Sequence, residues 1–260
     1  MLFRSILSTF TSIVMKLFYH IGKYVLLLGK VFSKPEKISI YWKQMLREMD
    51  NLGLGSLGII SIISVFMGAV VVIQTASAID SAWLPEYTIG FTTRQSIILE
   101  FSPTIIALIL AGKVGSNISS EIGMMRVTEQ IDALEIMGVN SAAYLILPKI
   151  IASVIINPFL VVISMFLGLA GGWFVSFATN ICSTHTYLYG IQYDFDNFGV
   201  FYALIKTIFF AFAITSVSAY HGYYADGGAL EVGKSSTKAV VYSSIVILII
   251  NYVLTQLLLI

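Results

Sequence analysis

The sequence predicts an all-α integral membrane protein, with an N-terminal amphipathic helix in the membrane interface and five helices that cross the bilayer. Composition is the first reason: 57% of the 260 residues are hydrophobic and 11% are charged, whereas about 25% charged is usual for a soluble domain. The second reason is that apolar runs of about 20 residues, long enough to cross a bilayer, recur along the chain. The third is that most charges gather outside these runs.

The same composition excludes several classes of protein. So low a share of charge excludes a water-soluble enzyme and a disordered tail, and a net charge of +1 leaves no basic surplus for binding nucleic acid. One cysteine, Cys182, excludes an internal disulfide and a metal site made of several thiolates. The histidines His20, His185 and His221 lie in three separate regions, so we expect no metal site. No Ser-His-Asp or paired-carboxylate pattern indicates hydrolysis, so no catalytic residues are predicted.

The first domain, residues 1–50, predicts helices that lie on the membrane. Four lysines recur at seven-residue steps with apolar residues between them: Lys16, Lys23, Lys30 and Lys37. A seven-residue step returns to nearly the same helix face, and a basic stripe beside an apolar face is typical of an interfacial helix. A signal peptide fits less well, because Lys16 interrupts the apolar run and no small-residue cleavage site follows. Pro35 is expected to break this helix, and Ile38 to Met49 predicts a second short amphipathic helix.

Five apolar stretches in the second domain, residues 51–260, predict the membrane spans. They are Leu57–Ala78, Ile97–Gly115, Leu145–Ala178, Phe201–Tyr220 and Val240–Leu259. The third is longer than one crossing requires, so we expect it to be tilted, kinked at Pro158 or extended beyond the lipid. Small residues at four-residue steps in the second and third spans predict close helix packing.

The basic residues predict the orientation of these spans. All but two of the 15 lysines and arginines precede span one, flank or lie within the connection between spans two and three, or precede span five. The two exceptions, Arg94 and Lys206, are assigned to the opposite side. Because basic residues concentrate on the cytoplasmic side, the N-terminus is predicted to be cytoplasmic, and the C-terminus, after an odd number of spans, to lie outside.

The connection between spans two and three, residues 115–140, is the least membrane-like part of this domain. Its apolar residues fall near helical spacing, and four acids accompany a single base, Arg126. The acids are Glu121, Glu129, Asp132 and Glu135. The segment therefore predicts a helix with one apolar face and an acidic outer surface. Two interpretations of it stay open: a solvated amphipathic connector, or a docking helix for a cytoplasmic partner.

Residues 228–235 of the second cytoplasmic connection match the phosphate-binding loop pattern G-x-x-x-x-G-K-[ST] letter for letter. That loop needs a buried strand before it and a soluble helix after it, so that its backbone N–H groups converge on the phosphates. Here membrane spans lie on both sides. We therefore interpret the match as accidental, with glycines that allow a tight turn and close helix packing.

Glu100 is an ionisable residue near the outer end of span two, beside Pro103. A charged side chain within a span usually faces protein or water and serves a function, because its burial in lipid is costly. We therefore interpret Glu100 as a functional residue, with snorkelling to the interface as the alternative.

Several motifs resemble the MlaE/YrbE family over about Leu52 to the C-terminus. The most specific is Glu121-Ile-Gly-Met-Met-Arg-Val-Thr-Glu-Gln-Ile-Asp-Ala-Leu-Glu-Ile-Met-Gly138. The others are Glu100-Phe-Ser-Pro103, Gly112-Lys-Val-Gly115, Pro148, Gly171-Gly172 and the run from Gly233 to Val241. The resemblance implies a permease subunit of an ABC transporter that moves phospholipids between the inner and outer membranes of a diderm bacterium.

The resemblance also implies partners. Two copies of the permease would pair as a homodimer around an apolar cavity in the inner membrane. A dimer of ATPase subunits would bind from the cytoplasm, and a ring of MCE-domain proteins would continue the lipid path in the periplasm. The chain itself would need no cofactor, since ATP and Mg²⁺ would be bound by the partner ATPase.

The resemblance assigns candidate residues to two sites. It makes the helix at residues 129–138 the coupling helix, and its candidates are Glu121, Arg126, Glu129, Asp132, Leu134, Glu135 and Gly138. The candidates for the lipid path are Glu100, Pro103 and Asn251. This chain departs from many family members at Leu99, where they have arginine, and at Asn251, where they have an acid. These departures call the polar network around the lipid path into question.

Two other functions are compatible with a five-span protein. An ion-coupled secondary transporter usually shows more intramembrane acids and internal repeats than this sequence does. A membrane assembly factor would have no transport role at all. Lipid transfer that requires ATP would distinguish the permease from both.

Overall fold

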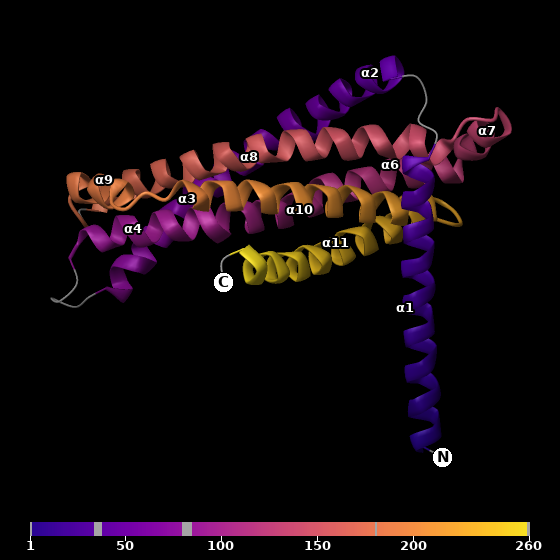
Figure 1. Ribbon diagram of the computed structural model, residues 1–260, viewed down its shortest axis with the longest axis horizontal. Helices are drawn as coiled ribbons and strands as arrows, with labels where there is room; N and C mark the ends of the chain where they lie inside the picture. The colour runs from indigo at the N-terminus through magenta and orange to yellow at the C-terminus, as the bar shows by residue number, and fades with distance from the viewer. Residues whose placement is uncertain (1, 34–37, 80–84, 180, 259–260) are drawn as a thin grey trace.

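A computed structural model describes residues 2–33, 38–79, 85–179 and 181–258, with the backbone alone for residues 2–14, 17 and 38–40. All regular structure in these ranges is helical. Five of the described helical segments are long and apolar enough to cross a membrane, which confirms the predicted class, and they lie alongside one another in Figure 1. These segments are Tyr41–Ala78, Tyr87–Val127, Ser141–Thr179, Asn197–Tyr223 and Ala229–Leu258.

Helix α1 (Leu2–Phe32) runs across the direction of the other long helices, as Figure 1 shows. This is the arrangement of a helix that lies in the membrane plane beside helices that cross it. Large apolar side chains such as Phe18 and Leu26 are exposed, so they are available to insert into the interface. Pro35, which is expected to break this helix, and Lys37, the last lysine of the predicted stripe, lie outside the described residues.

Helix α1 is attached to the bundle through polar and aromatic contacts with helix α10 (Asn197–Tyr223). The Tyr24 hydroxyl lies 2.7 Å from Ser216 Oγ, and His20 Nδ1 lies 2.7 Å from the Tyr220 hydroxyl. The Lys23 ammonium group lies 3.8 Å from the centre of the Tyr224 ring, a cation–π contact. The attachment is at the end of the bundle that carries helix α7 (Gln130–Ile136), called the α7 end below.

The second predicted amphipathic helix is present as α2 (Ile38–Met49). It continues without a break through the π-helical η1 (Asp50–Leu54) into α3 (Gly55–Ala78), so the first spanning segment begins well before the predicted residue 57. The division of the chain at residue 50 into two domains stays a prediction.

Span two is longer at both ends than predicted. It consists of α4 (Tyr87–Ser96), η2 (Ile97–Ile105), α5 (Ile106–Leu110), η3 (Ala111–Gly115) and α6 (Ser116–Val127). Residues 116–127, expected in the cytoplasmic connection, belong to the bundle because Ile118, Ile122 and Gly123 are buried against its neighbours. The π-helix η2 contains Pro103, which has no N–H for the regular hydrogen-bond ladder.

Helix α8 (Ser141–Thr179) forms span three and includes Pro148 and Pro158. Its 39 residues rise about 58 Å, so it extends beyond a hydrocarbon layer of about 30 Å. A Cβ atom on Gly68 of α3 would collide with the carbonyl group of Gly168, so the two backbones touch where only glycine fits. The close packing that the small residues of span three predict is therefore present.

The remaining elements complete the bundle. Helix α9 (Thr184–Gln192) packs against α4 at the end opposite α7, and α11 (Ala229–Leu258) packs along α10 with most of its surface exposed. Arg94 is buried at the α9 end and not displayed on the surface. Its guanidinium group donates to the carbonyl oxygens of Ile191 and Tyr193 at 2.9 Å.

Residues 229–235 of the motif that matches a phosphate-binding loop are helical, because they form the start of α11. Their backbone N–H groups are committed to the helix beyond its first turn. A Cβ atom on Gly233 would meet no atom within 4 Å, so the expectation that this glycine allows a tight turn or close packing is wrong.

Candidate functional site

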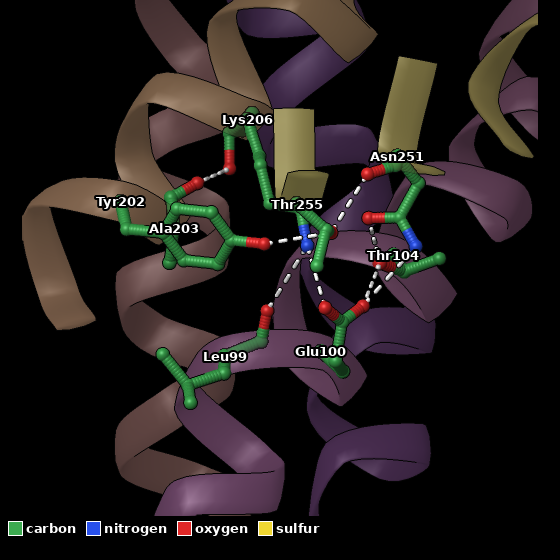
Figure 2. A network of polar contacts seen from close by, with 9 residues as sticks. Leu99, Glu100, Thr104, Tyr202, Ala203, Lys206, Asn251 and Thr255 are labelled. Atoms are coloured by element: carbon green, nitrogen blue, oxygen red, sulfur yellow. Dashed lines mark hydrogen bonds and ion pairs between the residues drawn. The ribbon is translucent and has the colours of Figure 1, made fainter. Parts of the chain in front are cut away.

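Figure 2 shows a network of polar side chains that joins three spans. It lies in the part of span two nearer α9, because η2 follows α4 directly. The Lys206 ammonium group on α10 donates to Glu100 Oε1 on η2 at 2.7 Å. The Asn251 side-chain amide on α11 donates to Glu100 Oε2 at 3.1 Å. Two of the three lipid-path candidates, Glu100 and Asn251, are therefore in direct contact. The third, Pro103, is buried one turn further along η2.

Further groups satisfy the polar atoms of this network. The Thr104 hydroxyl lies 3.3 Å from Glu100 Oε2 and 3.4 Å from Asn251 Oδ1. Lys206 also donates to the carbonyl oxygen of Leu99 at 3.4 Å, and its ammonium group lies 4.5 Å from the centre of the Tyr202 ring. The network thus gives Lys206 a carboxylate, a carbonyl oxygen and an aromatic face.

The two charges of the network differ in exposure. The Lys206 side chain is 0% exposed, whereas the Glu100 side chain is 43% exposed. A buried ammonium group requires a paired anion, so Glu100 is held in place by Lys206. Its exposed part remains available at the surface of an apolar bundle. The arrangement can offer a charged acceptor to the polar group of an otherwise apolar molecule.

The helix that carries Glu100 is longer than predicted. Glu100 lies more than three helical turns inside the segment that begins at Tyr87. The reason is that residues 87–96, which are too polar to read as lipid-exposed, continue the helix by packing against α9. Glu100 therefore has an ion-pair partner on a neighbouring span, which favours the functional interpretation over snorkelling.

The second candidate site is α7 and its surroundings. Arg126 at the end of α6 forms an ion pair of 2.6 Å with Asp132 on α7. Ile131 is fully buried and anchors the short helix. Glu129 precedes α7 in the left-handed conformation, with φ 58°, and Gly138 follows it with φ 78°. Two residues in the left-handed region thus lie on either side of α7 and set its direction relative to the bundle.

Glu135 attaches α7 to the bundle. Its Oε1 atom accepts hydrogen bonds from the Tyr223 hydroxyl at 2.9 Å and from the Ser141 hydroxyl at 3.0 Å. These two donors, Tyr223 first, lower the pKa of the Glu135 carboxyl below its usual value. Leu134 is half-buried, whereas Ile136 is 87% exposed at the tip of the segment.

The acidic outer surface expected for this segment is smaller than predicted. Glu121 lies on α6, away from α7, where it accepts from the Lys149 ammonium group at 2.8 Å. Lys149 also donates to Glu48 on α2 at 2.6 Å. Asp132 and Glu135 are paired as described. Glu129 is exposed, and its side chain has no hydrogen-bond or ion-pair partner in the described part of the chain.

Comparison with known proteins gives the family. The model of the family described as Permease MlaE matches residues 45–257, which is most of the chain. The chain belongs to the MlaE permease family. Relatives include a probable ABC transporter permease protein of Rickettsia bellii, 35% identical over 91% of each chain. A protein of Synechocystis with the same description is 35% identical over 89% of this chain and 88% of its own. The intermembrane phospholipid transport system permease protein MlaE of Haemophilus influenzae is 29% identical over 88% of each chain.

As an MlaE-family permease, the chain is a multi-pass transport subunit, and its site includes Lys206, which the sequence did not mark as a site residue. Lys206 was counted among the basic residues of the outer side, and the structure buries it in span four as the partner of Glu100. The sequence carried a signal for this lysine, because residue 206 lies inside the predicted span 201–220, where a charged side chain needs a partner. Within the described residues, no group of three His, Cys, Asp or Glu side chains lies close enough together to hold a metal ion.

Proposed function

We propose that this MlaE-family permease moves phospholipids between the inner and outer membranes of a diderm bacterium, energised by a separate ATPase subunit that binds ATP and Mg²⁺. The observation that carries the proposal is the Glu100–Lys206–Asn251 network, a polar patch within an apolar bundle. A phospholipid has a polar headgroup on a large apolar body, so it matches both parts. The Haemophilus influenzae relative, named for intermembrane phospholipid transport, supports this choice of substrate.

The proposed assembly contains two permeases, an ATPase dimer and a periplasmic ring of MCE-domain proteins. The face of α11 offers Ile245, Leu248 and Tyr252 to a second copy, since all three are exposed in the single chain. The ATPase would bind α7 at the cytoplasmic side, and the MCE ring would meet the α9 end. In this arrangement the N-terminus is cytoplasmic and the C-terminus is periplasmic.

The proposed mechanism depends on span two being one continuous helical segment. One helical segment, Tyr87–Val127, carries Glu100 in the part nearer α9 and reaches α7 at its other end. The Arg126–Asp132 ion pair and the Glu135 hydrogen bonds attach α7 to this segment and to α10. ATP binding that moves α7 would therefore move spans two and four, which carry Glu100 and Lys206, relative to Asn251 on α11. This movement would change the exposure of Glu100 and release the lipid.

The test is transfer of a fluorescent phospholipid from liposomes that contain the whole complex to acceptor liposomes, with and without ATP. Ile136→Asp should abolish ATPase stimulation and transfer, because it puts a charge on the most exposed apolar residue of α7. Leu188→Asp, on an exposed residue of α9, is the matched control and should keep the ATPase bound. Native mass spectrometry of the same complex should show two permeases and two ATPases.

Two results would contradict the proposal. If the Ile136→Asp variant still stimulates the ATPase and transfers phospholipid, α7 is not the ATPase contact. Transfer that proceeds equally without ATP would indicate ion-coupled transport.

A further inference from the structure

An open cleft of about 620 Å³, called the cavity below, is lined by both polar and apolar groups in the α7 half of the bundle, where η1, η3, α6 and the start of α11 meet. Its lining includes the side chains of Asn51, Ser56, Lys113, Asn117 and Ser236. Lys113 is the one cation among the lining residues, and none of them is acidic. The cavity is separate from the Glu100 network, because Lys113 follows Glu100 by more than three helical turns on the same segment.

The cavity lies near the depth at which α1 joins the bundle. Gly115, beside the lining residues Val114 and Ser116, packs on Ser218 of α10. The hydroxyl of Tyr24 on α1 contacts Ser216 of the same turn. Since an amphipathic helix lies at the boundary between headgroups and acyl chains, the cavity lies near the headgroup layer of the leaflet that holds α1.

Two polar groups at the cavity have hydrogen-bonding capacity to spare. Ser56 is fully buried and lines the cavity, yet its hydroxyl oxygen has no hydrogen-bond partner within the described residues. A buried hydroxyl without a partner is costly and needs an explanation. The Lys113 ammonium group has three protons, and within the described residues it donates to the carbonyl oxygen of Gly55 alone. Its remaining protons can reach an anionic ligand.

The wall that α11 contributes leaves room for a ligand. Gly233 lines the cavity, and a Cβ atom there would meet no atom within 4 Å. Any other residue at this helical position would project into the open space. Glycine within a helix costs up to about 1 kcal/mol relative to alanine, so the open space is kept at some cost in stability.

We propose that this cavity binds the phosphate group of an anionic phospholipid from the leaflet in which α1 lies. Lys113 supplies the positive charge, and Ser56 and the neighbouring amide and hydroxyl groups supply hydrogen bonds to the phosphate oxygens. The acyl chains extend toward the membrane interior along the bundle. This site does not rest on the proposed transport function, since a lipid can bind here whether or not it is transported.

The test is a lipid titration of the full-length chain in detergent, followed by native mass spectrometry. We expect phosphatidylglycerol, which is anionic, to bind about fivefold more tightly than phosphatidylcholine, the effect of one lysine near the membrane surface. Lys113→Gln should remove this preference, because it keeps the length of the side chain and removes its charge. Gly233→Leu should weaken binding of phosphatidylglycerol by filling the cavity, and it should fold because the position is helical and open.

Lys43→Gln is the matched control, because Lys43 is an exposed lysine of α2 that does not line the cavity. It should keep the preference for phosphatidylglycerol. A preference that survives both Lys113→Gln and Gly233→Leu, or that Lys43→Gln removes equally, would overturn the proposal. Inorganic phosphate should not displace the lipid at equal concentration. Displacement would show a site for free phosphate and would overturn the assignment to a lipid.

Discussion

Lys206 and Lys149 are both lysines buried among membrane helices, but their carboxylate partners differ in number. Lys206 has one, Glu100, and the other groups around it are neutral. Lys149 has two, because Glu48 of α2 and Glu121 of α6 both lie within 2.8 Å of its ammonium group. The cluster around Lys149 joins three helices near the α7 end and has one carboxylate more than the lysine needs for charge balance. Lys206 has a single carboxylate and no second one within the described residues.

The difference separates a structural contact from a candidate working site. A lysine with two anions tolerates the loss of one, which suits a fixed junction between helices. A lysine with one anion is sensitive to anything that competes for that carboxylate, such as the polar group of a ligand or a shift of span two. Glu100 is also bonded to Asn251, so its carboxylate responds to the positions of three spans at once.

The largest expected effect comes from removing the single anion. Glu100→Ala leaves Lys206 buried without a carboxylate, which should cost about 2 kcal/mol of stability, less than for a fully buried pair because Glu100 is half-exposed. Lipid transfer should also be lost. Thermal unfolding in detergent and the liposome transfer assay measure the two effects.

The double variant Glu100→Ala with Lys206→Met is the control for stability. It replaces the pair by apolar groups, so it should recover most of the lost stability without recovering transfer. A double variant that transfers lipid at the rate of the unaltered protein would show that the network only serves packing.

A smaller effect is expected at the Lys149 cluster. Glu121→Gln should cost no more than about 1 kcal/mol, because Glu48 still pairs with the lysine. The double variant Glu48→Gln with Glu121→Gln should cost more than the two single losses together, as coupled residues do. Unfolding of all four proteins in a double-mutant cycle measures this coupling. Additive losses would contradict the redundancy of the two carboxylates.

The smallest effect is expected at Glu135, an acid of α7 that is held by neutral donors. Its pKa is lowered in the folded protein, so it stabilises the fold above the unfolded value of 4.5, and this contribution is lost as the pH falls through the folded value. Glu135→Gln should therefore destabilise by about 0.5 kcal/mol at neutral pH, a small value because the group is exposed to solvent.

The pH dependence of unfolding checks this sign. The difference between Glu135→Gln and the unaltered protein should shrink as the pH falls below about 4.5, where the carboxyl is protonated in the unfolded chain. Tyr223→Phe, which removes the main donor, should weaken the pH dependence. A difference that grows toward low pH would show that the carboxyl is stabilised in its protonated form.

The sequence by itself determined the number of spans, the character of the N-terminal helix and the family. Runs of apolar residues as long as those near residues 57–78 or 240–259 can be satisfied only in lipid, so composition alone indicates them. The seven-residue spacing of the lysines likewise fixes one face of α1. The motif from Glu121 to Gly138 is local in sequence, so it was recognisable without a structure.

The tertiary structure decided which polar groups meet. Glu100 contacts Lys206 and Asn251, which are more than one hundred residues away along the chain, and only the packing of three helices brings them together. The same packing placed Glu121 beside Lys149 and drew residues 116–127 into the bundle. Hydropathy reports whether a residue prefers lipid or water, whereas a buried charge is placed by its partner, and the partner depends on how the helices are aligned with one another.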